Sequence, residues 1–122
     1  MALTLFGIPN CDTVKKARAW LDGQGFTHLF HDFKKRGVPA DQLGEWVQAV
    51  GWEALLNRRG TTFRGLSEDD KAHIDHAKAV ELMLAHPSLI KRPVVVADDG
   101  KVTVGFSEAA YADTFAIAKQ SQ

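Results

Sequence analysis

The stretch LTLFGIPNCDTVKKA, residues 3–17, decides the fold of this chain. It opens with the apolar run Leu3–Phe6, which predicts a short buried strand. Gly7–Asn10 supplies turn residues, and apolar side chains then recur at helical spacing from Val14 onward, with charged residues between them. The stretch therefore predicts a strand, a turn and an amphipathic helix that begins directly after Cys11.

A second strand and a helical block follow. Residues 26–33 alternate roughly between apolar and polar side chains and predict a strand, so the chain opens as β-α-β. From Pro39 to about His86 the apolar residues keep helical spacing, and no strong strand signal appears. We therefore expect an all-helical insertion over about residues 39–86.

The end of the chain returns to strand patterns. Pro93–Ala97 is rich in β-branched residues, Asp99–Gly100 is typical of a hairpin turn, and Val102–Phe106 predicts the partner strand. Ser107 then opens a last helix. The order β-α-β, helices, β-β-α is that of an α/β, thioredoxin-like fold with a helical insertion, and the length predicts one domain over residues 1–122.

Composition limits the classes of function. Fifteen basic and fifteen acidic residues cancel, so no overall charge favours nucleic acid or a membrane as partner. A single cysteine allows no internal disulfide, and no signal-like or long apolar segment appears, so we expect a cytoplasmic protein. His73 and His76 share a helical spacing, but no set of ligands completes a metal site. We expect neither a metal nor a bound cofactor.

Cys11 is placed where a thiol is reactive. At a helix N-terminus it meets unpaired backbone N–H groups and the positive end of the helix dipole, which favour the nucleophilic thiolate. The alternative is a small buried apolar side chain. Because Val14 stands three residues later, no Cys-x-x-Cys pair can resolve a mixed disulfide within the chain. Another molecule must do so, and glutathione is the abundant thiol of a reducing compartment.

The neighbours of the cysteine form the first candidate binding residues. Thr13 has a hydroxyl and a backbone N–H close to the sulfur, although it also suits an ordinary first helical turn. Lys15 and Lys16 add positive potential for the carboxylates of glutathione, unless they are simply solvated, whereas the charge of Asp12 disfavours a thiolate. We expect Asn10, Thr13 and Lys15 to contact substrate or glutathione.

Arg92–Pro93 is the second candidate region. Pro93 comes directly before a strand and is a candidate for a cis peptide bond, because the cis form of an X–Pro bond costs little. In thioredoxin-like proteins a cis-proline lies against the active-site sulfur. Arg92 would then hold an anionic substrate or steady the thiolate at Cys11, unless it is a plain surface arginine. Arg58 is a further candidate, although the helix dipole alone favours an arginine at a helix C-terminus.

Three segments together resemble the ArsC/Spx family, and in particular its YffB-like branch. They are FGIPNCDTVKKA at residues 6–17, LLNRRGTTFR at residues 55–64 and HPSLIKRPV at residues 86–94, in this order along nearly the whole chain. The resemblance implies a thioredoxin-like fold with a helical insertion. It also implies that Cys11 is the nucleophilic or redox cysteine.

The resemblance carries a departure from the arsenate reductases of the family. Those enzymes place three arginines around the cysteine, and Arg92 matches one of them. The second position falls on Asn57, with Arg58 directly after it, and the third falls on Gly105. A histidine that precedes the family cysteine corresponds to Gly7. Each lost charge-assisted contact weakens an oxyanion complex by about 1.5–3 kcal/mol, so we expect arsenate to be a poor substrate.

The sequence thus predicts a glutathione-dependent thiol reductase acting on a small-molecule or protein disulfide. Cys11 attacks the oxidised substrate, glutathione serves as co-substrate, Arg92 recruits the anionic partner and Pro93 shapes the groove. One alternative is an arsenate reductase with an altered oxyanion pocket. Another is an Spx-like regulator that binds RNA polymerase, although the family's Cys-x-x-Cys switch is lost at Val14.

Overall fold

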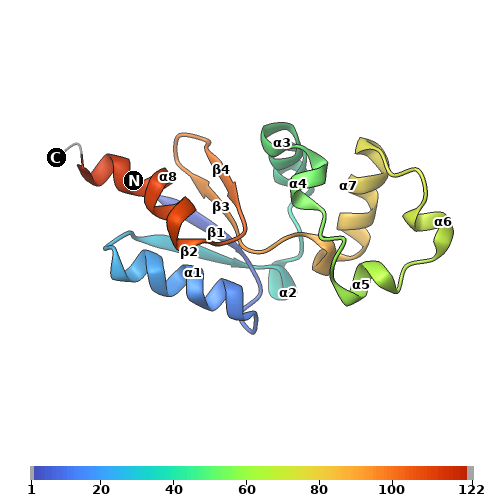
Figure 1. The fold of residues 1–122 in the computed structure, drawn as a ribbon, viewed down its shortest axis with the longest axis horizontal. Coiled ribbons are helices and arrows are strands. Elements are labelled where there is room, and N and C mark those ends of the chain that lie inside the picture. The colour runs from blue at the N-terminus through green and yellow to red at the C-terminus, as the bar shows by residue number, and fades with distance from the viewer. Residues whose placement is uncertain (1, 121–122) are drawn as a thin grey trace.

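The computed structural model describes the backbone of residues 2–120 and the side chains of residues 2–115. Four strands form one sheet in the order β2-β1-β3-β4: β1 Leu3–Gly7, β2 His28–Asp32, β3 Val94–Ala97 and β4 Val102–Val104. β1 runs parallel to β2 and antiparallel to β3, and β3 pairs antiparallel with β4 (Figure 1). The predicted thioredoxin-like fold class is confirmed.

Two helices pack on one face of the sheet. They are α1, Asp12–Gly23, and α8, Glu108–Gln120. α1 buries the apolar stripe that its spacing predicts, and these side chains meet Leu5, Val95 and Tyr111 in one core cluster. Burial raises the pKa of the Tyr111 hydroxyl, which therefore stays protonated and donates to the Gly105 carbonyl at 2.9 Å. None of the described helices is long and apolar enough to cross a membrane.

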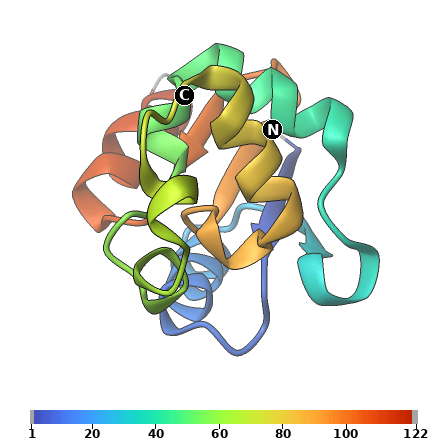
Figure 2. The same ribbon diagram turned by 90° about the vertical axis from the view of Figure 1, so that its right-hand side faces the viewer.

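The segment between β2 and β3 is helical and lies at one end of the sheet (Figures 1 and 2). Its elements are α2 Phe33–Arg36, α3 Ala40–Val50, α4 Trp52–Leu55, α5 Thr61–Arg64, α6 Glu68–Lys71, α7 His76–Ala85 and the 3-10 turn η1 Pro87–Leu89. A single antiparallel bridge joins Leu56 to Ile90, so the chain after α4 lies beside the chain that leads into β3. This bridge ties the helices to the sheet end.

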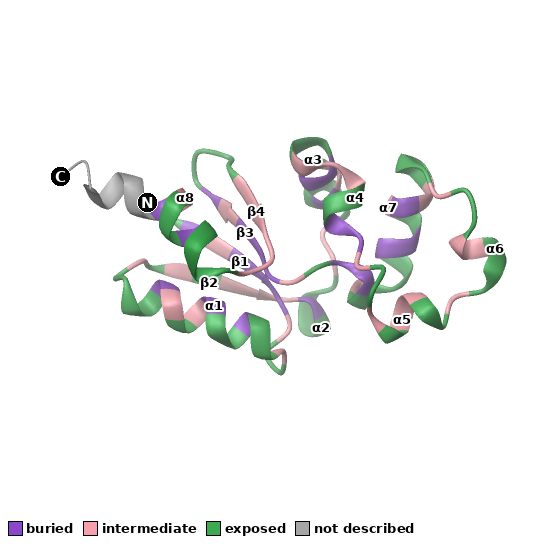
Figure 3. Cartoon of the chain, in the orientation of Figure 1, coloured by how far each residue is buried: buried purple, intermediate pink, exposed green. Residues whose placement is uncertain are grey.

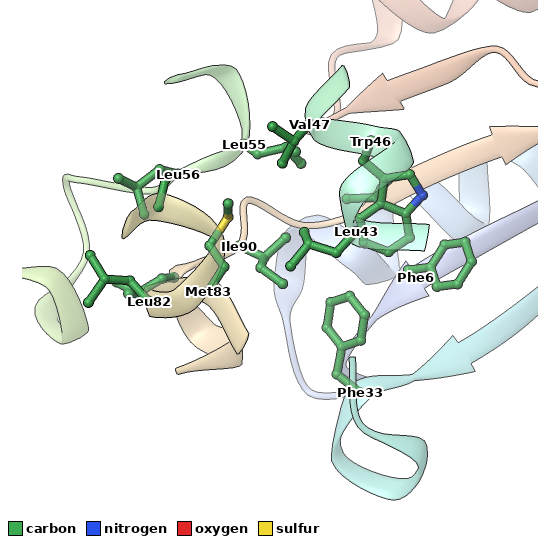
Figure 4. Packing of buried hydrophobic residues seen from close by; sticks show 13 residues of the cluster. Phe6, Phe33, Leu43, Trp46, Val47, Leu55, Leu56, Leu82, Met83 and Ile90 are labelled. Carbon is green, nitrogen blue, oxygen red and sulfur yellow. The ribbon is translucent and has the colours of Figure 1, made fainter. Parts of the chain in front are cut away.

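A second core cluster joins these helices to the sheet (Figure 4). Trp46 of α3 is buried, and the edge of its ring meets Phe6 of β1 with ring centroids 4.7 Å apart. The Phe33 ring lies with its centroid 6.4 Å from that of Phe6 and 6.4 Å from that of Trp46. The inward faces of α3 and α7 are buried while the outer turns are exposed (Figure 3). The helical insertion thus shares a hydrophobic core with the sheet.

The expected ends of two strands are wrong. The strand predicted to reach Phe33 stops at Asp32, because the Asp32 side chain accepts from the Lys34 N–H at 2.8 Å and caps α2. The strand predicted to reach Phe106 stops at Val104, because Gly105 has φ +79° and leaves the extended region. Gly105 instead turns the chain back, with its N–H donating to the Pro93 carbonyl at 2.8 Å.

Candidate active site

One end of each of the four strands, with the segments that leave or enter them, lies at the same end of the sheet. The strand directions place the carboxyl ends of β1, β2 and β4 and the amino end of β3 at this end of the sheet. The loop that carries Cys11 leaves β1 there, α2 begins there, and the Arg92–Pro93 peptide enters β3 there. In Figure 1 this end of the sheet faces the helical insertion. The topology therefore gathers residues that are far apart in the sequence.

Cys11 is the N-cap residue of α1. Its backbone is extended, with φ −104° and ψ 125°, and its carbonyl accepts from the Lys15 N–H at 2.9 Å. The sulfur makes no capping hydrogen bond, and the thiol is half-buried against the core under α1. The first N–H groups of the helix have no intrahelical acceptor and point toward this end. The predicted position of the thiol at the start of a helix is confirmed.

Val14, three residues after the cysteine, packs between α1 and the end of β1. It is fully buried, and a Cβ built on Gly7 would lie 2.8 Å from its Cγ2 atom. Gly7 is therefore required for α1 to approach the end of β1 this closely. The same contact leaves no room at position 7 for the histidine of the arsenate reductases unless Val14 moves.

The Arg92–Pro93 peptide bond is cis, as predicted. Phe6 pairs with Val94 in antiparallel strands, so Gly7, which follows Phe6, and Pro93, which precedes Val94, face each other at this end of the sheet. Pro93 is buried and Arg92 is half-buried. The cis peptide thus borders the start of the loop that leads to Cys11.

Two hollows flank this loop. The first, here called the Arg92 cavity, has a volume of about 240 Å³. It is lined by Ile8, Phe33, Lys34, Pro87, Ser88 and Arg92. The second, here called the α1–α8 groove, is wider, at about 760 Å³. It is lined by Thr13, Lys16, Ala19, Trp20, Phe106, Ser107 and Glu108.

The structure separates the predicted binding residues. Thr13 lines the α1–α8 groove and Arg92 lines the Arg92 cavity. Asn10 and Lys15 are exposed on the loop and on α1. Arg58 lies with its guanidinium carbon 5.9 Å from the centre of the Trp52 ring, a cation–π contact within the insertion.

Sequence reasoning missed residues that line the two hollows. Lys34 follows β2 at the same end of the sheet as Cys11, and the parallel β-α-β pattern carried a signal for this position. Ser88 lies in a segment of the family resemblance, and its hydroxyl is 2.9 Å from that of Thr62. Glu108 joins Lys16 only because the start of α8 packs beside α1, which no local pattern reveals.

Comparison with known proteins agrees with this arrangement of a thioredoxin-like sheet and one cysteine at a helix start. The sequence model of the ArsC family matches residues 6–114. The chain belongs to the ArsC family, and is thus an arsenate-reductase-like protein of the thiol-based redox type.

Several relatives share most of its length. The solution structure of an arsenate reductase (ArsC) related protein from Brucella melitensis is 53% identical, covers 94% of this chain and 95% of its own, and superposes with a TM-score of 0.75. A YffB protein structure is 51% identical over 91% of this chain and 96% of its own, with a TM-score of 0.86. The global transcriptional regulator Spx of Streptococcus mutans is 28% identical over 87% of this chain and 77% of its own.

Proposed function

We propose that this protein is a glutathione-dependent thiol reductase with Cys11 as its nucleophile. One observation carries the proposal: the half-buried sulfur stands at the N-cap of a twelve-residue helix without a capping hydrogen bond, in a chain with no second cysteine. The helix end stabilises an anionic sulfur, and the missing second thiol requires an external one.

The reaction follows from thiol–disulfide exchange. The Cys11 thiolate attacks one sulfur of a substrate R–S–S–R, which forms Cys11–S–S–R and releases one R–S⁻ that takes a proton from water. A glutathione thiolate then attacks the Cys11 sulfur and releases the second thiol. A second glutathione attacks the glutathione sulfur, so that oxidised glutathione leaves and the Cys11 thiolate returns. One disulfide is reduced to two thiols for two glutathiones oxidised to one disulfide.

The α1–α8 groove fits glutathione best. Lys16 and Glu108 give it one charge of each sign, which complements the carboxylate and ammonium groups of a zwitterionic peptide. The Thr13 hydroxyl adds a hydrogen-bonding group on the first turn of α1, and Trp20 and Phe106 add apolar surface. The groove starts two residues from Cys11. These features support glutathione as the resolving thiol.

Two glycines favour a disulfide over arsenate as the substrate. Gly7 is packed against Val14, and Gly105 has φ +79°, so neither position carries a cation. Arg92 alone remains of the positive groups that surround the cysteine in the arsenate reductases. The hydrogen bonds that one cation makes offset only part of the free-energy cost of removing an oxyanion such as arsenate from water.

The Spx relatives supply a second candidate, a protein-binding regulator with RNA polymerase as the partner. That role needs no reactive thiol. Its Cys-x-x-Cys switch is absent here, because the fully buried Val14 occupies the second position.

A panel of oxidants with reduced glutathione tests the proposal. We expect turnover of a small disulfide such as hydroxyethyl disulfide, and arsenate turnover below about 1 per second, the lower end of typical enzyme rates. The oxidation of glutathione, coupled to glutathione reductase and NADPH, measures both. Arsenate reduction at ordinary enzyme rates, or no turnover of any disulfide, would contradict the proposal.

A further inference from the structure

We propose that the Arg92 cavity binds the organic group that the substrate carries on its sulfur, and that this group combines an apolar body with one anionic end such as a carboxylate. The inference rests on the proposed function, because it names the substrate class for the same thiol chemistry. Glutathione takes the α1–α8 groove in this scheme, so the two partners of Cys11 occupy different hollows.

The lining of the cavity defines the chemistry of its ligand. Ile8, Phe33 and Pro87 supply apolar surface, and the cationic residues Lys34 and Arg92 also border the cavity, whose surface is mostly apolar. An apolar hollow with a few convergent polar groups is the usual form of a small-molecule site. The charged residues that line the α1–α8 groove are a lysine and a glutamate, whereas those that line the Arg92 cavity are a lysine and an arginine.

Among the side chains that the structure describes, neither cation has a carboxylate partner. The ion pairs among the described residues are His28–Asp22 and Lys71–Glu68, and neither involves Lys34 or Arg92. The carboxylate of Asp32, two residues before Lys34, accepts from the Lys34 backbone N–H and caps α2. The positive charge of the cavity is therefore available to an anion, and Arg92 can bind a carboxylate through two parallel hydrogen bonds.

Size and position fit a group attached to the Cys11 sulfur. The cavity volume of about 240 Å³ is below the range of roughly 300–1,000 Å³ typical of drug-sized ligands, so it suits a single ring or short chain with one carboxylate. Ile8 precedes Cys11 by three residues, which span at most about 11 Å of extended chain. In the Cys11–S–S–R intermediate, an R group of about this length can extend to the cavity while its sulfur stays on Cys11.

Ligand binding without redox chemistry tests the pocket directly. The Cys11→Ser protein is titrated with para-(methylthio)benzoate and with the neutral para-(methylthio)benzamide, followed by NMR of the backbone amides. We expect the benzoate to bind about fivefold to tenfold tighter, with the largest shifts at Ile8, Lys34 and Ser88. Neither probe contains a disulfide, so the outcome does not depend on whether glutathione is the resolving thiol.

A pair of charge reversals supplies the matched control. In the Cys11→Ser background, Lys34→Glu should abolish the preference for the benzoate, whereas Lys35→Glu should leave it within about twofold. Lys35 is the exposed neighbour on the same helix and makes the same change in net charge, but it does not line the cavity. Equal binding of the two probes, equal effects of the two variants, or shifts confined to the α1–α8 groove would overturn the inference.

Discussion

Replacing the one cysteine, Cys11→Ser, should remove all catalysed disulfide reduction by glutathione and leave only the uncatalysed exchange in solution. Serine keeps the size of the side chain but is a far weaker nucleophile at neutral pH, and the chain has no other thiol to replace it. The measurement is the rate of glutathione oxidation with hydroxyethyl disulfide, with and without protein.

The fold of this variant supplies the control. The sulfur makes no capping hydrogen bond and is only half-buried, so the urea midpoint of Cys11→Ser should stay close to that of the parent chain. A Cys11→Ser protein that is folded and still accelerates the reaction would show that the thiol is not the nucleophile.

Gly7→Ala should destabilise the protein by about 1–3 kcal/mol, because the new Cβ would overlap the buried Val14 side chain. The built Cβ lies 2.8 Å from Val14 Cγ2, which is closer than real Cβ atoms come, and α1 or β1 must shift to accept it. The free energy of unfolding from urea titration measures the effect.

Gly44→Ala is the matched control for Gly7→Ala. Gly44 lies inside α3, and a Cβ there would meet no atom within 4 Å, so alanine should stabilise the helix by about 0.5–1 kcal/mol. If Gly7→Ala is neutral or stabilising, as Gly44→Ala should be, the close approach of β1 and α1 does not require a glycine.

Local patterns were sufficient for the segment that carries the thiol. The apolar run at Leu3, the turn residues and the helical spacing after Cys11 predicted β1 and α1, and the β-branched run after Pro93 predicted β3. The cis peptide at Arg92–Pro93 was predicted from the family resemblance together with its place before that strand, and it is confirmed. These features depend on neighbours in the sequence, which a single chain displays directly.

The hollows beside the cysteine depend on contacts between distant segments, and the sequence alone did not reveal them. The Arg92 cavity joins the ends of β1 and β2 to the turn after α7, and the α1–α8 groove joins the first helix to the last. Arg58 contacts the Trp52 ring within the insertion, and its role in binding stays a prediction. The candidate binding residues thus depend on packing between distant segments, whereas the candidate nucleophile depends on local structure.

The most direct test of the central claim is the intact mass of the protein after incubation with oxidised glutathione. A reactive Cys11 without a resolving partner should take up one glutathione per chain, and reduced glutathione should remove it again. The Cys11→Ser protein should stay unmodified under the same conditions. A parent chain that remains unmodified, or an adduct that reduced glutathione does not release, would contradict a thiol reductase that uses Cys11 and glutathione.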